Sequence, residues 1–281
     1  MAKILDGKAV AAEVRSEVAA EVARLKDRGA PVRLDVILVG DDPASATYVR
    51  MKQKDCDEVN IESRAHRFEA DTPQRELAAL VERLNADAAV SGFFIQLPLP
   101  EGLDALSLLS EIDPAKDVDG LSPLSVGRLS IGLPSLLPCT PHGVVQLLRR
   151  SGVEIEGKEA VVIGRSNLVG KPLAQLLLRE NATVTVCHSR TKNLPEVSRR
   201  AELLVVAAGR REFLGAEYVS EGAVVVDVGI HAREGGGLVG DVKSEEVEPA
   251  ASWISPVPGG VGPMTRAMLL YNTVQATRPA G

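Results

Sequence analysis

The alternation of apolar runs with amphipathic segments constrains the fold of this chain more than any other feature. Short runs rich in valine, leucine and isoleucine are separated by segments whose apolar residues recur at helical spacing. A strand that is apolar along its whole length is buried on both faces, and the helices that connect parallel strands supply that cover. The pattern therefore predicts an α/β fold built on parallel sheet.

The expected elements form two series. The first contains helix 8–28, strand 34–39, helix 44–59, strand 63–68, helix 73–85 and strand 88–96. The second contains helix 142–150, strand 160–163, helix 171–179 and strands 183–187, 203–207 and 223–228. Residues 97–141 lie between the two series and carry seven prolines, so we expect a loop-rich domain boundary that contributes to a site.

Composition narrows the class of function. A length of 281 residues allows two domains or one large α/β unit. A net charge of −6 and an aromatic content of 3% argue against nucleic-acid binding and favour small-molecule partners. The three cysteines form no CxxC pair, which suits a reducing cytosol, and the histidines show no zinc-ligand spacing. We see neither a signal peptide nor a membrane-spanning apolar run, and expect a soluble intracellular protein.

Six of the ten residues from Pro256 to Thr265 are proline or glycine, and a helix follows them. Gly262 can serve as the N-cap of this helix and Pro263 as its first residue. Bare glycine amides before a helix N-terminus can approach a cofactor or an acidic substrate. The alternative is a tight structural turn.

A second glycine-containing turn follows strand 160–163 and leads from Gly164 through Gly170 into a helix, the order of a phosphate-binding βαβ unit. The spacing departs from GxGxxG. The next strand ends without the carboxylate that NAD enzymes use for the ribose hydroxyls. Arg165, Ser189 and Arg190 could surround a 2′-phosphate instead, which favours NADP over NAD. The alternative is that both arginines are solvated surface charges.

Lys52 lies within an otherwise apolar stripe of helix 44–59, one turn after Tyr48. The lysine either extends its ammonium group to water or is buried, and burial would favour a neutral amine that can act as a base. Gln96 ends an apolar strand. Asp117 and Asp119 would point the same way if their segment is extended, unless they belong to a solvated turn or a cation site.

Taken together, these motifs resemble one family, the bifunctional methylenetetrahydrofolate dehydrogenase/methenyltetrahydrofolate cyclohydrolases. The segments that carry the resemblance are spread over nearly the whole chain: 39–45, 48–54, 96–100, 116–120, 138–141, 164–166 and 256–265. One departure is Asn60, where many relatives have glycine, and asparagine tolerates the left-handed conformation expected there.

The resemblance implies an N-terminal α/β/α catalytic domain over residues 1–140, which the last helix, 263–281, rejoins. It implies a Rossmann-type NADP-binding domain over residues 141–262, a folate cleft between the domains and a cytoplasmic homodimer. The expected reactions are NADP-dependent oxidation of 5,10-methylenetetrahydrofolate and hydrolysis of the 5,10-methenyl product to 10-formyltetrahydrofolate, in one-carbon metabolism and purine biosynthesis.

The resemblance also implies roles for single residues. Lys52 is the catalytic lysine, Tyr48 and Gln96 orient it and the folate, and Asp119 holds the pterin. The remaining substrate-binding residues are Leu97, Pro258, Gly259, Gly260, Val261 and Gly262. The cofactor-binding residues are Gly164, Arg165, Ser166, Ser189, Arg190 and Ile230.

Two alternatives stay open at this point. A single-activity, NAD-dependent methylenetetrahydrofolate dehydrogenase would share the fold. A non-catalytic nucleotide-binding protein on the same scaffold would bind the cofactor without turnover, although the presence of Tyr48, Lys52, Gln96 and Asp119 together argues against it.

Overall fold

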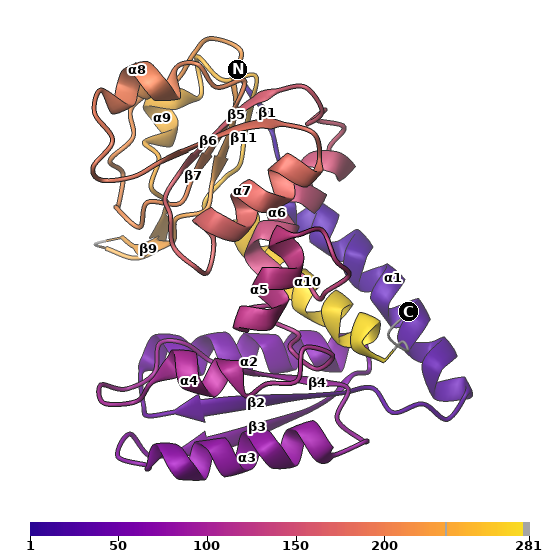
Figure 1. Ribbon diagram of the computed structural model, residues 1–281. Helices are drawn as coiled ribbons and strands as arrows, with labels where there is room; N and C mark the ends of the chain where they lie inside the picture. The colour runs from indigo at the N-terminus through magenta and orange to yellow at the C-terminus, as the bar shows by residue number, and fades with distance from the viewer. Residues whose placement is uncertain (234, 278–281) are drawn as a thin grey trace. The chain divides into compact units, whose positions relative to one another are not determined.

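The computed structural model describes residues 1–233 and 235–277 of the chain (Figure 1). The chain forms two compact units. The three-stranded unit comprises residues 13–139 and the chain from Arg266 onward, and the six-stranded unit comprises residues 1–12 and 140–265. Each is described by itself.

The three-stranded unit contains a parallel sheet in the order β3-β2-β4. Its strands are β2 (Arg33–Val39), β3 (Glu62–Phe68) and β4 (Gly92–Ile95). Helices α2 (Pro43–Glu58) and α3 (Gln74–Ala86) lie on opposite faces of this sheet (Figure 1). All seven residues of β2 are buried, which is the signature of a central parallel strand covered on both sides.

Strand β4 is shorter than the sequence predicts. The apolar run from 88 was expected to be strand, but Asp87 accepts a hydrogen bond from the amide of Ala89 through its side chain, and Val90 donates to the carbonyl of Asp87. These hydrogen bonds hold residues 87–90 in a turn although the run is apolar, and strand pairing of β4 begins only at Gly92.

The segment 97–141, expected to be loop, contains two short helices, α4 (Ala105–Ser110) and α5 (Pro123–Ser130). Asp104 and Ser122 cap them by accepting the amides of Ser107 and Ser125. Capping side chains and a proline in the first turn of α5 are helix-start signals, so these two helices, which were not predicted, could have been read from the sequence.

The six-stranded unit contains a wholly parallel sheet in the order β1-β11-β8-β7-β5-β6. The strands are β1 (Lys3–Ile4), β5 (Glu159–Ile163), β6 (Thr183–Cys187), β7 (Leu203–Val206), β8 (Val224–Asp227) and β11 (Trp253–Ile254). A small antiparallel pair is formed by β9 (His231–Ala232) and β10 (Leu238–Val239). The two-residue strands are too short to leave a pattern, and the sequence did not predict them.

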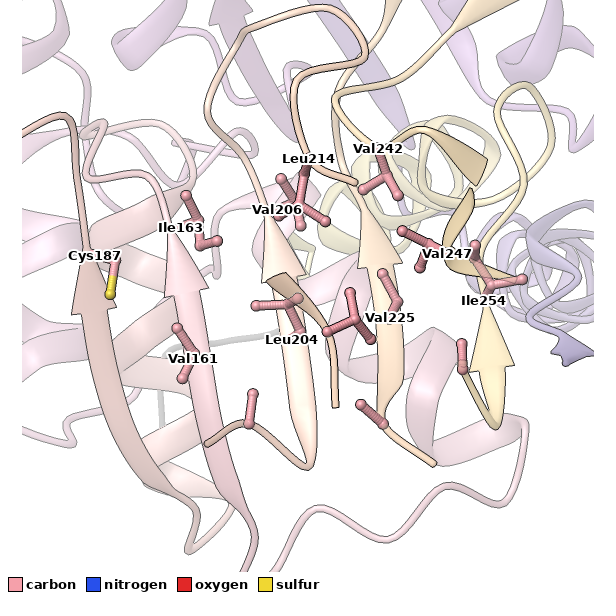
Figure 2. Packing of buried hydrophobic residues seen from close by; sticks show 14 residues of the cluster. Val161, Ile163, Cys187, Leu204, Val206, Leu214, Val225, Val242, Val247 and Ile254 are labelled. Carbon is pink, nitrogen blue, oxygen red and sulfur yellow. The ribbon is translucent and has the colours of Figure 1, made fainter. Parts of the chain in front are cut away.

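Branched aliphatic side chains form the core of this unit. Figure 2 shows Val161, Leu204 and Val225 in a row across three neighbouring strands, with Ile163 and Val206 above the first two. Side chains at positions two apart on a strand share a face, so this row is one continuous apolar surface.

The other helices are α1 (Gly7–Asp27), α6 (Cys139–Arg150), α7 (Gly170–Arg179), α8 (Leu194–Ser198), α9 (Ser244–Val247) and α10 (Val261–Ala276), with a 3₁₀ turn, η1, at Ala216–Tyr218. The last helix begins one residue before its expected cap, Gly262, and positions 278–281 of the expected helix lie outside the described residues. Asn60 has a φ of 60°, as predicted. Within the described residues, no helix is long and apolar enough to cross a membrane.

His142 on α6 is buried, and this burial, with the charges of Arg149, Arg179 and Arg150, lowers its pKa from 6.5 to about 4. Between these values the unfolded chain binds a proton that the folded chain does not, so stability falls as pH falls. The effect reaches about 3 kcal/mol below both pKa values.

We therefore expect His142→Gln to lose less stability than the wild-type chain between pH 7 and pH 4. Urea unfolding at several pH values measures this difference directly. Identical pH dependence in the two proteins would show that the imidazole has the same pKa in the folded and unfolded states, and would contradict the lowered value.

Candidate functional site

The order of strands in the six-stranded sheet places a ligand site at its carboxyl edge. From β5 the chain moves to β6 on one side, and then crosses to β7 on the other side of β5. The loops after β5 and β7 therefore diverge, and in open parallel sheets ligands bind in the crevice at such a reversal.

The turn after β5 requires its two glycines. Gly164 has a φ of 134°, and a Cβ there would overlap the carbonyl of Ala207. A Cβ at Gly170 would overlap the carbonyl of Gly164. Ser166 Oγ accepts the amides of Val169 at 3.1 Å and Gly170 at 3.4 Å, which closes the turn onto the start of α7. The backbone thus leaves room for a phosphate at a positive helix terminus.

Basic side chains accompany this turn. Ile163 pairs with Cys187 in the sheet, so Arg165 and Arg190 follow neighbouring strand ends. Arg165, Ser189 and Arg190 are exposed, and neither arginine forms an ion pair with a carboxylate of the described residues. The arrangement leaves both guanidinium groups available to an anionic ligand.

The glycine-rich run near residue 260 folds as a tight turn. The amide of Gly260 donates to the carbonyl of Pro256 at 2.7 Å, and Gly259 has a φ of 116°. A Cβ at Gly262 would lie 3.5 Å from Cδ1 of Ile230, which is 38% exposed. Two segments singled out from the sequence, 258–262 and Ile230, therefore meet within the six-stranded unit.

Lys52 is held by two neighbours within the three-stranded unit. Its Nζ donates to Oε1 of Gln96 at 3.1 Å and lies 3.9 Å from the centre of the Phe94 ring. Gln96 in turn donates from Nε2 to the carbonyl of Leu97 at 2.8 Å, which fixes its amide with the oxygen toward the lysine. Tyr48 is 40% exposed, and in this part of the described chain no hydrogen bond joins it to Lys52.

The segment of Asp117 and Asp119 is a turn and not an extended strand, so the condition under which the two side chains would point the same way is not met. Asp117 is buried, and its carboxylate accepts the amides of Gly120, Leu121 and Ser122, so it shapes the loop. Burial raises the pKa of the Asp119 carboxyl, Lys52 acts in the opposite direction, and Asp117 adds to the rise. Asp119 thus lies within electrostatic reach of Lys52.

Sequence reasoning missed two buried aspartates, Asp227 and Asp241, at the carboxyl edge of the six-stranded sheet. The available signals were an aspartate within an otherwise apolar strand and an aspartate flanked by Gly240 and Val242. Among the described residues no group of three His, Cys, Asp or Glu side chains is suited to hold a metal ion.

Comparison with known proteins gives one consistent result. Residues 5–119 match the tetrahydrofolate dehydrogenase/cyclohydrolase catalytic domain, and residues 138–280 match the NAD(P)-binding domain of the same family. The chain is 73% identical over 278 residues to "Bifunctional protein FolD 1" of Rubrobacter xylanophilus, covering 99% of this chain and 98% of that protein.

Two solved structures are similar over nearly the whole chain. The FolD methylenetetrahydrofolate dehydrogenase/cyclohydrolase of Campylobacter jejuni has a TM-score of 0.97 at 48% identity, covering 99% of each chain. The Trypanosoma brucei enzyme, complexed with NADP cofactor and an inhibitor, has a TM-score of 0.93 at 41% identity, covering 98% of this chain and 97% of that one.

The turn geometry predicts that Gly170→Ala destabilises the protein by about 1–3 kcal/mol, the usual cost of overpacking. The matched control is Gly262→Ala, which also adds a methyl group to a helical position but makes only an ordinary contact. The free energy of unfolding in urea is the measurement. Equal stability of the two variants would mean that the Gly164–Gly170 contact relaxes freely.

Proposed function

The chain belongs to the tetrahydrofolate dehydrogenase/cyclohydrolase family, and from this premise we propose how its residues divide the family's two reactions. It is a bifunctional enzyme that oxidises 5,10-methylenetetrahydrofolate with NADP and hydrolyses the resulting 5,10-methenyltetrahydrofolate to 10-formyltetrahydrofolate. The alternatives of a single-activity or a non-catalytic protein are therefore set aside.

NADP fits the cradle after β5. The backbone there is kept bare by Gly164 and Gly170, whose side-chain positions are filled by other backbone atoms. We assign the phosphates to the start of α7 and the 2′-phosphate to Arg165, Ser189 and Arg190, with Ser166 closing the turn. The bound cofactor accepts the hydride. Ile230 would contact it farther along the same sheet edge.

The oxidation needs no acid or base from the protein. Loss of hydride from the bridging methylene leaves a methenyl cation that the folate nitrogens themselves stabilise, so alignment is the main contribution of the chain. We assign Asp119 to the amino edge of the pterin, where a carboxylate accepts charge-assisted hydrogen bonds. Leu97 and the turn from Pro258 to Gly262, which includes Gly259, Gly260 and Val261, would contact the rest of the substrate.

The hydrolysis needs a group that moves protons, because water adds to the methenyl carbon and the ring then opens. We assign this role to Lys52, on the basis of its hydrogen bond to Gln96. Gln96 accepts a hydrogen bond from the ammonium group and thereby fixes its direction. The Phe94 ring makes a cation–π contact with the same group. Tyr48, exposed one turn earlier on α2, is available to the substrate.

We further propose that the enzyme is a cytoplasmic homodimer whose product serves purine biosynthesis. Cys56, Cys139 and Cys187 are all free and buried, which suits a reducing compartment. Among the residues that the structure describes, strand β3 pairs with β2 alone, so one side of a seven-residue strand is open to a second copy. Light scattering that gives the 29.8 kDa mass of a single chain would contradict the dimer.

Lys52→Met should lower cyclohydrolase turnover by about a hundredfold or more, the usual scale for a lost general acid/base, and lower dehydrogenase turnover less. Methionine keeps the approximate length of the side chain and deletes the titrating amine. Absorbance of the methenyl intermediate follows both reactions in the same variant.

Lys54→Met is the matched control, because Lys54 lies on the same helix with an exposed side chain. It should leave both turnovers within about twofold of wild type. Near wild-type hydrolysis by Lys52→Met would remove the lysine from the mechanism, whereas a parallel fall of both activities would assign it to substrate binding.

Arg165→Ala should raise the KM for NADP about tenfold or more, the scale of one lost charge-assisted hydrogen bond, and change the KM for NAD much less. Arg200→Ala is the control, since Arg200 is exposed on the same unit and lies 3.6 Å from Glu196. Steady-state kinetics with each cofactor make the comparison. Equal increases for NADP and NAD would refute the assignment of Arg165 to the 2′-phosphate.

A further inference from the structure

Two buried aspartates tie together the loops at the carboxyl edge of the six-stranded sheet. Asp227 ends β8 and is 1% exposed, and Asp241 follows β10 and is fully buried. Neither has a role in the functional assignments made above. Burying two carboxylates is costly unless each is well supplied with hydrogen-bond donors, so their partners show what they are for.

Asp241 gathers donors from two segments. Its Oδ2 accepts the amides of Ala208 at 2.7 Å and Gly209 at 2.9 Å. Its Oδ1 accepts the amide of Arg210 at 2.9 Å and lies 2.7 Å from Nε2 of His231. Gly209 has a φ of 65°, which turns three successive amides toward one point.

Three converging amides form the kind of concave nest that binds anions. Here the chain fills the nest with its own carboxylate. These amides are therefore not offered to a phosphate of the cofactor, and the start of α7 remains as the phosphate site. The carboxylate serves instead to fix the course of the chain after β7.

Asp227 fixes Asp241 in turn. Its Oδ1 accepts the amide of Asp241 at 3.0 Å and that of Gly229 at 2.9 Å, and its Oδ2 accepts the amide of Val242 at 2.9 Å. A Cβ at Gly229 would overlap the Asp241 carboxylate, and one at Gly240 would overlap that of Asp227. The network is closely packed and has little freedom to rearrange.

The segments held by Asp241 adjoin the proposed cofactor residues. Ala207, just before the nest, donates to the carbonyl of Ile163 at 2.7 Å, and its own carbonyl occupies the space beside Gly164. His231 directly follows Ile230. One carboxylate thus sets the position of two segments on which NADP would lie.

We propose that Asp241 is a positioning residue for NADP, which acts through the loop Ala208–Arg210 and through His231. This inference rests on the proposed placement of the cofactor at Gly164–Ser166 and Ile230. Hydrolysis of methenyltetrahydrofolate does not consume NADP, so the network should govern the dehydrogenase selectively.

The test compares Asp241→Asn, His231→Leu and His231→Gln in the full-length enzyme. The asparagine amide turns one acceptor into a donor that faces other donors, so the KM for NADP should rise about tenfold or more. His231→Leu should raise it severalfold, and His231→Gln, which keeps a donor for Asp241, should stay within twofold of wild type. Cyclohydrolase turnover without NADP should be unchanged in all three.

A network that only stabilises the fold would lower both activities together, and that result would overturn the proposal. Equal KM values for NADP in the two His231 variants would also overturn it, and they decide the question if Asp241→Asn does not fold. Arg165→Ala distinguishes failure of the proposed cofactor site from failure of the positioning role of Asp241. If it impairs NADP use while the His231 variants do not differ, the cofactor site stands and the positioning role falls.

Discussion

Parallel pairing of β7 with β5 and β8 is the constraint on which the six-stranded unit depends. Ile163 lies beside Val206, and Val206 lies beside Asp227, so three strands end at the same level. The loop segments that follow these three strands are crowded together. This crowding explains why Gly164 and Gly229 have no room for a side chain and why buried carboxylates accept hydrogen bonds from the loop amides. The proposed ligand site lies at this edge, where the register brings the three strand ends together.

Elements with long apolar patterns could be predicted from the sequence because burial alone specifies them. Strands β7 and β8, in which every residue is buried, differ from the predicted bounds by one or two residues. Strand β6 has the predicted bounds although only Cys187 of its residues is buried, and its alternating threonine and valine residues mark it instead. Strands β1 and β11 could not be predicted, since two residues gain order only from their neighbours. Local side-chain chemistry explains the other errors: Asp87 shortens β4, and the caps of α4 and α5 interrupt the expected loop.

In the candidate site too, the sequence indicated some residues, whereas only the structure reveals their partners. Lys52 stood out because a lysine within an apolar stripe is unusual, but its hydrogen-bond partner is Gln96, 44 residues away, and not Tyr48 one turn before it. The sequence drew attention to the Asp-x-Asp motif, yet only the hydrogen bonds of the turn show that Asp117 stabilises the loop. Asp241 escaped notice because its donors come from residues 208–210 and 231, which no local pattern connects.

The way in which Lys52 is held bears on its chemistry. A carboxylate in direct contact would favour the charged ammonium and oppose release of its proton. Gln96 offers a neutral oxygen instead, and the Phe94 ring faces the charge without an acceptor atom. The charge of Lys52 opposes the rise in the pKa of the Asp119 carboxyl that burial causes, and no ion pair between the two is found among the described residues. Lys52 is therefore oriented by a neutral hydrogen-bond acceptor and an aromatic ring, and these two contacts support the role proposed for it in hydration of the methenyl carbon.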